Sequence, residues 1–324
     1  LLTLLTAVVC AILPNATAVI LIAPIVIQVC KELETDFTGP LILTAIISNA
    51  AGLLTLVGDP ATFLVGQAAG LSFMSYLKKI SPGGLLSILV VIPLMPWLFG
   101  TVWKARRRLS PDLRPDPITR PGFCVLSLFA LAVMVALFLV GDYLPIPVVP
   151  PSAAIIGASL ALLALHVSRY ESTEAVFRDI DWRTLVFIFC MMCFVEEITK
   201  TGIMSGLSRL LYAGFGDHLL EAALVLLASI GLLSGFLANI PVVAAAILLA
   251  KGYLVMAKVV PELALGFGYT DWPPQSLPIF AGMMFGGTLG GNVTLIGSSA
   301  TLIAAGICAS HGKPISFASF MRYG

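Results

Sequence analysis

The sequence predicts an all-α polytopic membrane protein made of two inverted repeats, each with a re-entrant hairpin and a broken transmembrane helix. The first observation behind this prediction is composition: 59% of the residues are hydrophobic, 11% are charged, and the mean hydropathy is +1.02. A soluble domain contains about 25% charged residues. This chain therefore has too much apolar surface for a soluble fold, and we expect an integral membrane protein that crosses the bilayer several times.

The second observation is an internal repeat. The stretch Thr55-Leu56-Val57-Gly58-Asp59-Pro60-Ala61-Thr62 returns as Thr294-Leu295-Ile296-Gly297-Ser298-Ser299-Ala300-Thr301. An asparagine precedes each copy, Asn49 in the first and Asn292 in the second. Each copy continues into an apolar run and a similar tail, so we interpret the two stretches as corresponding parts of two repeats.

The third observation is that long apolar segments in both halves are interrupted by Gly, Pro or Asn. A spanning helix needs about 20 apolar residues, and paired interrupted segments in the two halves of a membrane protein indicate a site between those halves. The first repeat core is expected over residues 1–82, with a hairpin at 1–30 that turns at Pro14-Asn15, a broken helix at 41–69 and an amphipathic helix at 71–80.

The remaining elements follow in the same order. Residues 83–183 are expected to hold scaffold helices at 83–103, 122–143 and 152–168, with a basic loop between the first two. The second repeat is expected over residues 184–324, with a helix at 184–199, a hairpin at 219–258 that turns at Asn239-Ile240-Pro241, and a broken helix at 276–310.

The charged loops predict the orientation of these elements. Loop 104–121 has an excess of Lys and Arg, which places it in the cytoplasm. The first hairpin then has both ends inside and the second has both ends outside, so the two broken helices cross in opposite directions. Lys78 and Lys79 fall on the outer side, and we expect them to snorkel from an interfacial helix.

Other features limit what the chain binds. The six cysteines all lie in apolar runs, which is typical of small buried hydrophobic residues. We predict no metal centre, no cofactor and no nucleic-acid partner. The chain begins without Met inside an apolar run and ends after an amphipathic stretch, so we expect it to be truncated at both ends.

The breaks are the candidate functional segments. Backbone groups cannot stay unpaired in hydrocarbon, so an unwound stretch at membrane depth is buried in protein or lines a wet cavity. The glycines and the proline expected to unwind the helices are Gly52, Gly58 and Pro60 in the first copy and Gly286, Gly287, Gly290, Gly291 and Gly297 in the second.

Helix ends exposed there carry partial charges. Neutral side chains beside them can hold Na⁺ through oxygens or an anion through N–H groups. The candidate binding residues are Asn15, Thr17, Asn49, Thr55, Gly58, Asp59, Asn239, Asn292, Thr294, Gly297 and Ser298.

Asp59 is the one acid in the repeated motif, and its counterpart in the second copy is Ser298. An ionisable side chain inside the membrane is expensive and indicates a functional role, here as a ligand for a cation or a carrier of a coupling proton. Asp-Pro is also a favourable start for a helix, so Asp59 is equally expected to cap the half-helix that follows. The two roles are compatible.

The two copies of the motif resemble the signatures of a known family. Ser48-Asn49-Ala50-Ala51-Gly52 through Gly58-Asp59-Pro60 is similar to the first signature of the ion transporter superfamily, and Gly290-Gly291-Asn292 through Ser298-Ser299-Ala300 to the C-terminal one. This superfamily contains arsenite permeases, the pink-eyed dilution protein, D-type sodium/proton antiporters and citrate-transporter-like domains. Asp181-Trp182-Arg183-Thr184-Leu185 resembles the opening of the family's second half. The resemblance implies two hairpins and two broken helices around a midplane site, with a scaffold that often dimerises.

The sequence departs from that pattern at both hairpin tips. The family often has Leu-Asp-Asn-x-Thr and Asp-Asn-Ile-Pro, where this chain has Leu13-Pro14-Asn15-Ala16-Thr17 and Ala238-Asn239-Ile240-Pro241. The loss of two carboxylates weakens a sodium/proton antiporter interpretation. We therefore expect a secondary active transporter of a small anion, a carboxylate or an oxyanion, with Na⁺ or H⁺ coupling implied by the resemblance. A Na⁺/H⁺ antiporter and an uncoupled anion channel are the alternatives, and no nucleophile–base set indicates an enzyme.

Overall fold

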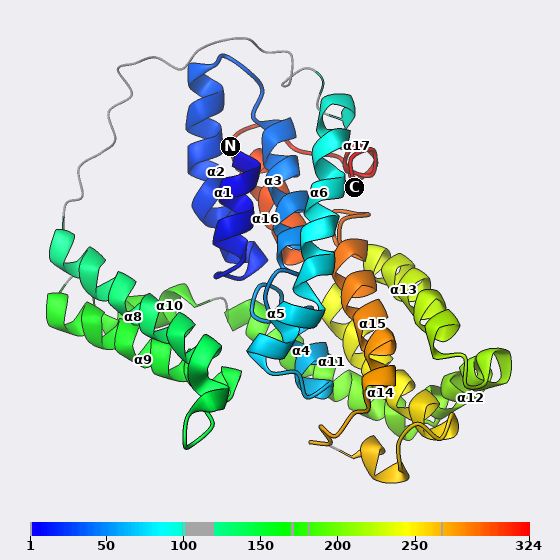
Figure 1. Cartoon of the computed structure of the whole chain (residues 1–324). Coiled ribbons are helices and arrows are strands. Elements are labelled where there is room, and N and C mark those ends of the chain that lie inside the picture. Colours follow the sequence, from blue (N-terminus) through cyan, green and yellow to red (C-terminus); the bar gives the residue numbers. More distant parts are fainter. Residues whose placement is uncertain (1, 99, 101–119, 170–171, 181, 267) are drawn as a thin grey trace. The chain divides into compact units, whose positions relative to one another are not determined.

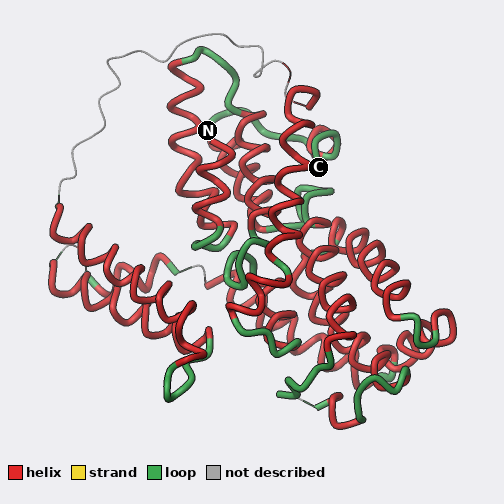
Figure 2. The backbone as a smooth tube through the Cα atoms, in the orientation of Figure 1, coloured by secondary structure: helices red, strands yellow, loops and turns green. Residues whose placement is uncertain are grey.

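The computed structural model describes residues 2–98, 100, 120–169, 172–180, 182–266 and 268–324. Every regular element among these residues is helical (Figure 2). The chain divides into a larger unit of residues 1–71, 76–109 and 188–324 and a smaller unit of residues 72–75 and 110–187. The predicted basic loop 104–121 lies outside the described residues, apart from Arg120 and Pro121.

The apolar helices fit a protein that crosses the membrane several times. Within the described residues, five helices are long and apolar enough to span a bilayer, and a sixth is added if the bent pair Phe73–Lys79 and Ser81–Trp97 counts as one span. Many large apolar side chains on these helices are exposed, for example Leu86, Val90 and Val125. Exposed apolar surface of this kind requires lipid as the solvent.

In the first half of the larger unit, the predicted hairpin is a helix pair, α1 (Leu2–Cys10) and α2 (Asn15–Glu32), and the predicted broken helix consists of α3 (Thr38–Ala51) and α4 (Pro60–Ala68). The break covers residues 52–59, because Gly52 ends α3 and the Asp59 side chain accepts a hydrogen bond from the Thr62 backbone N–H at the start of α4. The short helix α5 (Phe73–Lys79) and α6 (Ser81–Leu98) follow.

The second half repeats this order. Its helix pair is α13 (Leu219–Phe236) and α14 (Asn239–Met256), and its broken helix consists of α15 (Leu277–Gly290) and α16 (Ser299–Ser310). The short helix α17 (Phe317–Phe320) follows α16, as α5 follows α4 in the first half. Ser72 and Ser316 cap these two short helices with the same side-chain bond, to the backbone N–H groups of Ser75 and Ser319.

The prediction that five glycines unwind the second copy was wrong for three of them. The break spans only residues 291–298, and Gly286, Gly287 and Gly290 lie inside α15. A Cβ on Gly286 would approach the Leu227 carbonyl to 2.6 Å, and a Cβ on Gly290 would approach the Gly231 carbonyl to 2.2 Å. These glycines therefore let α15 lie directly against the backbone of α13, as small residues do between membrane helices.

The two halves exchange their second half-helices. α16 of the second half packs on α2 and α3 of the first, while α4 of the first half packs on α14 and α15 of the second (Figure 1). The larger unit thus contains a first group, made of α1, α2, α3 and α16, and a second group, made of α13, α14, α15 and α4. Both broken helices pass from one group to the other, so both breaks lie where the groups meet.

The other helices lie outside these two groups. α11 (Trp182–Lys200) covers the predicted helix 184–199, whereas the amphipathic helix α12 (Ile203–Phe215) was not predicted. Ser208 of α12 donates to the Leu249 carbonyl of α14. The smaller unit contains α8 (Pro121–Val140), α9 (Pro150–Ser168) and α10 (Thr173–Asp179), and α8 packs along α9.

Candidate functional site

The Asp59 carboxylate is buried, with 2% of the residue exposed, and it accepts hydrogen bonds from both halves of the chain. Its Oδ1 accepts from Nδ2 of Asn15 at 3.1 Å and from Nδ2 of Asn239 at 3.4 Å. Its Oδ2 accepts from Oγ1 of Thr288 at 3.0 Å and from the backbone N–H of Thr62 at 3.3 Å. The tips of both helix pairs and both broken helices therefore meet at one carboxylate.

Asn49 extends this set of contacts. Its Oδ1 accepts from Nδ2 of Asn15 at 2.9 Å, and its own Nδ2 lies 2.7 Å from Oδ1 of Asn292 and 2.8 Å from Oγ of Ser298. We use the name central network for eight of the residues joined by these bonds: Asn15, Asn49, Asp59, Thr62, Asn239, Thr288, Asn292 and Ser298.

The bonds between the two breaks are reciprocal. When the repeat is aligned with Asp59 on Ser298, the residue opposite Asn49 is Thr288. Asn49 donates to Ser298 of the other copy, and Thr288 donates to Asp59 of the other copy. The expectation that Asn49 and Asn292 correspond was wrong, because Asn292 aligns with Leu53.

A second set of contacts is the same in both halves and joins each break to the preceding helix pair. Thr55 Oγ1 donates to the Ala11 carbonyl at 2.8 Å, and Thr294 Oγ1 donates to the Gly235 carbonyl. The backbone N–H of Asn15 donates to the Gly58 carbonyl at 3.0 Å, and that of Asn239 donates to the Gly297 carbonyl at 3.3 Å. These bonds fix the two asparagine tips against the breaks.

The two glycines of this framework are required by space. A Cβ on Gly58 would come within 2.8 Å of the Gly52 carbonyl and 2.9 Å of the Cys10 carbonyl. A Cβ on Gly297 would come within 2.8 Å of the Gly291 carbonyl and 3.0 Å of that of Ser234. Because the nearest atoms are backbone, a side chain at either position would force the break away from the helix pair.

Four helices begin at the central network. α2 begins at Asn15, α14 at Asn239, α4 directly after Asp59 and α16 directly after Ser298. The N-terminal end of a helix carries about half a positive charge and presents N–H groups to anions. The buried carboxylate of Asp59 therefore lies in a field that favours negative charge.

The structure brings most of the predicted residues together. Asn15, Asn49, Asp59, Asn239, Asn292 and Ser298 are in the central network, while Thr55, Gly58, Thr294 and Gly297 form the framework that holds it. Thr17 is exposed and lies outside the network. Thr62 and Thr288 belong to the network but were not among the predicted binding residues, although extending the repeat alignment back from Asp59 and Ser298 pairs Thr288 with Asn49.

A family model described as "Citrate transporter" matches residues 1–268. The chain belongs to the citrate transporter family. An uncharacterized transporter of Synechocystis is 41% identical over 317 residues, covering 98% of this chain and 71% of that protein. An uncharacterized transporter of Mycobacterium tuberculosis is 31% identical over 327 residues, covering all of this chain and 72% of its own length.

A more distant relative supports the wider grouping. The human P protein is 24% identical over 399 aligned residues, which cover 99% of this chain and 46% of the P protein. The resemblance to the ion transporter superfamily is therefore confirmed. This citrate transporter family member is an integral multi-pass membrane protein.

Proposed function

We propose that this member of the citrate transporter family is a secondary active transporter that moves a small anion, a carboxylate or an oxyanion, coupled to Na⁺ or H⁺. The observation that carries the proposal is the buried carboxylate of Asp59, surrounded by donors from both halves and by four helix N-termini. The name of the family makes citrate the first substrate to test.

The charge of Asp59 supplies a reason for coupling. Two like charges 4 Å apart repel by about 4 kcal/mol at the effective dielectric of a protein near its surface. An ionised Asp59 therefore opposes an anion at the same helix ends. A proton, or a Na⁺ ion held by Asp59 and by the amide and hydroxyl oxygens beside it, removes this repulsion. The cation and the anion then bind together, which is symport.

The arrangement of the two halves supports alternating access. We infer that the halves are inverted repeats, each with a re-entrant helix pair, because each half contributes the same framework bonds and the bonds between the breaks are reciprocal. Inverted repeats around a central site allow one group to open while the other stays closed. Entry of an anion requires Asn15 or Asn239 to move, because both now bond to Asp59.

The test is uptake by the purified protein in proteoliposomes. Labelled citrate, succinate and sulfate are offered in separate assays, each against an imposed Na⁺ gradient and an imposed proton gradient. We expect one of these anions to accumulate against its own gradient when the coupling ion flows inward. Passive anion flux that only follows the electrochemical gradient would indicate the channel alternative and contradict the proposal.

Asp59→Asn tests the role of the carboxylate in the same assay. The amide keeps the shape of the side chain and removes its charge, so we expect coupled uptake to be lost while folded protein is recovered in the bilayer. Undiminished ion-driven uptake by Asp59→Asn would contradict the role. Collapse of a proton gradient by Na⁺, with no anion uptake, would instead favour the Na⁺/H⁺ antiporter.

A further inference from the structure

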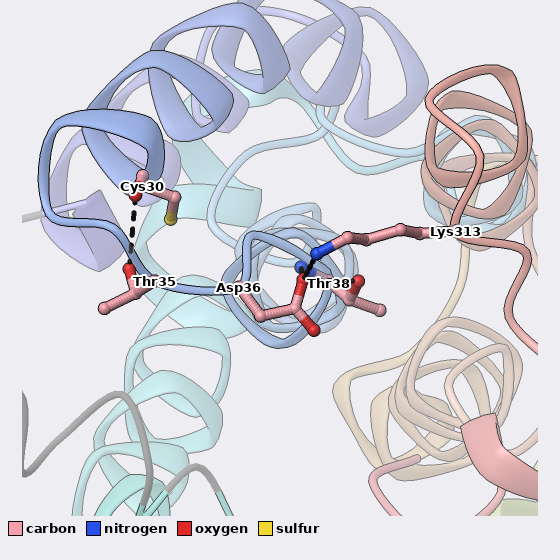
Figure 3. Close-up of polar contacts among 5 residues, drawn as sticks. All are labelled: Cys30, Thr35, Asp36, Thr38 and Lys313. Carbon is pink, nitrogen blue, oxygen red and sulfur yellow. Dashed lines mark hydrogen bonds and ion pairs between the residues drawn. The ribbon is translucent and has the colours of Figure 1, made fainter.

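An ion pair joins the two halves at the end of the first group that lies away from the central network (Figure 3). Lys313, which follows α16, places its Nζ 2.7 Å from Oδ1 of Asp36, in the loop between α2 and α3. The same oxygen of Asp36 accepts from the backbone N–H of Thr38 at 3.2 Å and from the Thr38 hydroxyl at 3.0 Å. The carboxylate thus holds the start of α3 and the end of α16 at once.

This ion pair lies over an apolar cluster. Lys313 Nζ is 5.0 Å from the centroid of the Phe37 ring, and Phe37 also contacts His311 edge to face at 5.8 Å. Phe37 is part of a buried cluster that reaches from Cys30 and Cys308 to Ala45 and connects α2, α3 and α16. The cluster closes the first group between the central network and the ion pair.

The corresponding end of the second group is closed by different chemistry. There, the loop between α14 and α15 contacts the segment after α4: Trp272 Nε1 donates to the Ala68 carbonyl at 2.8 Å, and a Cβ on Gly70 would lie 2.8 Å from the Thr270 carbonyl. In each group, the loop that follows a helix pair meets the segment that follows the other half's broken helix. One closure is ionic and partly exposed, and the other uses an aromatic side chain and backbone.

We propose that Asp36 and Lys313 form an ionic latch that holds the first group closed and opens once in each transport cycle. The latch joins α16 of the second half to α3 of the first, and these are helices whose separation would uncover the network from this side. The proposal rests on the proposed transport function, because a cycle requires the two groups to open in turn. It assigns to Lys313 and Asp36 control of access without contact with substrate.

The test uses a thiol placed between the latch and the network. Ala45 is buried on α3 in the apolar cluster that connects α2, α3 and α16, and it lies between Thr38 and Asn49 along the helix. Ala45→Cys is introduced into a variant without the six native cysteines, and its rate of reaction with a water-soluble maleimide is measured in liposomes without substrate. We expect Lys313→Gln to raise this rate about two- to fivefold, the population change that an exposed ion pair can produce.

Two controls keep the result specific. Lys200→Gln breaks a similarly exposed ion pair of 2.7 Å, with Glu197 inside α11, and should leave the labelling of Ala45→Cys unchanged. The exchange Asp36→Lys with Lys313→Asp should restore slow labelling. Equal labelling of Lys313→Gln and the parent would overturn the latch, as would an equal increase from Lys200→Gln.

A second measurement asks whether the latch opens during transport. Cysteines at positions 36 and 313, in the same background, are joined by a bifunctional thiol reagent, and uptake is measured before and after reductive release. We expect cross-linking to stop uptake and release to restore it. Full uptake by the cross-linked protein would overturn the latch. If no anion is transported even before cross-linking, the proposed function fails, and the labelling experiment still decides whether Asp36 and Lys313 hold the first group closed.

Discussion

At residues 52–59, and again at residues 291–298, a threonine hydroxyl and a glycine carbonyl fasten a broken helix to the tip of the helix pair before it. The two breaks share these backbone-directed bonds and the glycines that make room for them. They differ in the side chains at their centre, because Asp59 of the first copy corresponds to Ser298 of the second and Asn49 corresponds to Thr288. The framework is symmetric, while the charge is on one side only.

The shared threonines and glycines build the site, whereas the residues that differ between the two breaks determine where its negative charge lies. In the proposed function, an anion that enters meets donors from both halves, whereas a coupling cation meets one carboxylate. A symmetric pair of carboxylates would repel each other, and one of them would stay protonated. The described network holds one carboxylate, that of Asp59, so this conflict does not arise.

Moving the carboxylate to the other copy gives the largest expected effect. We expect Asp59→Ser to lower gradient-driven uptake about 100-fold or more, because the coupling cation of the proposed function would lose its charged partner, and breaking a buried charge pair costs about 3–5 kcal/mol. Adding Ser298→Asp should restore much of this loss, since Nδ2 of Asn49 and the backbone N–H of Thr301 already face the side chain at position 298. Uptake in proteoliposomes measures both.

The control for that exchange is Thr17→Val, a substitution at an exposed position outside the central network, which should retain coupled uptake. If the exchange variant folds and stays inactive, the site depends on the copy that holds the carboxylate and the functional symmetry is wrong. Folding is checked by size-exclusion chromatography and thermal unfolding in detergent.

The framework glycines test structural symmetry. Gly58→Ala and Gly297→Ala should each lower the free energy of unfolding by about 3 kcal/mol, because overpacking against fixed backbone costs up to that amount. Gly306→Ala in α16 is the control: its Cβ meets nothing within 4 Å, and alanine is the better helix former. Thermal unfolding measures all three, and a large loss for only one of the two framework glycines would show that the breaks are not equivalent.

The framework threonines should show the same symmetry with a smaller effect. Thr55→Val leaves the partly buried carbonyl of Ala11 without its donor, and Thr294→Val does the same to the buried carbonyl of Gly235, which costs about 1–2 kcal/mol in each case. Thr17→Val is the control, because Thr17 is exposed and such surface changes stay within about 0.5 kcal/mol. Unfolding midpoints that fall for Thr17→Val as much as for the other two would contradict the framework role.

The sequence was informative where the chain must do something unusual for a membrane helix. Asp59-Pro60 and the tips at Asn15 and Asn239 interrupt apolar runs, so the breaks and turns were predictable from single residues. The partners of these residues were not predictable, because the exchange of α4 and α16 between the halves is decided by tertiary packing. Thr288 looks like an ordinary polar residue in an apolar helix until its contact with Asp59 is known.

The role of a glycine was also not predictable from the sequence. A glycine in a membrane helix permits either unwinding or close packing, and the sequence alone does not distinguish the two at Gly286 and Gly290. The structure does, because both glycines lie against the backbone of α13. The helix α12 was missed for a different reason: it is amphipathic and 13 residues long, so a search for apolar spans of about 20 residues passes over it.

The ionic latch should give the smallest effect and a defined pH dependence. Partial burial acts to raise the pKa of Asp36, but hydrogen bonds from Lys313 and Thr38 outweigh it and hold the pKa below its usual value. A carboxyl group with a lowered pKa stabilises the closed form fully above its usual pKa of about 4, and this contribution is lost as the pH falls through the lowered value.

Because both side chains are exposed, the ion pair of the latch contributes about 0.2–1 kcal/mol to the stability of the closed form. Labelling of the Ala45→Cys variant should therefore accelerate below about pH 4 in the parent and change less with pH in Lys313→Gln. The comparison uses a thiol reagent whose own pH dependence is calibrated on a free thiol. Parallel pH profiles for the two proteins would contradict a role for Asp36 in the latch.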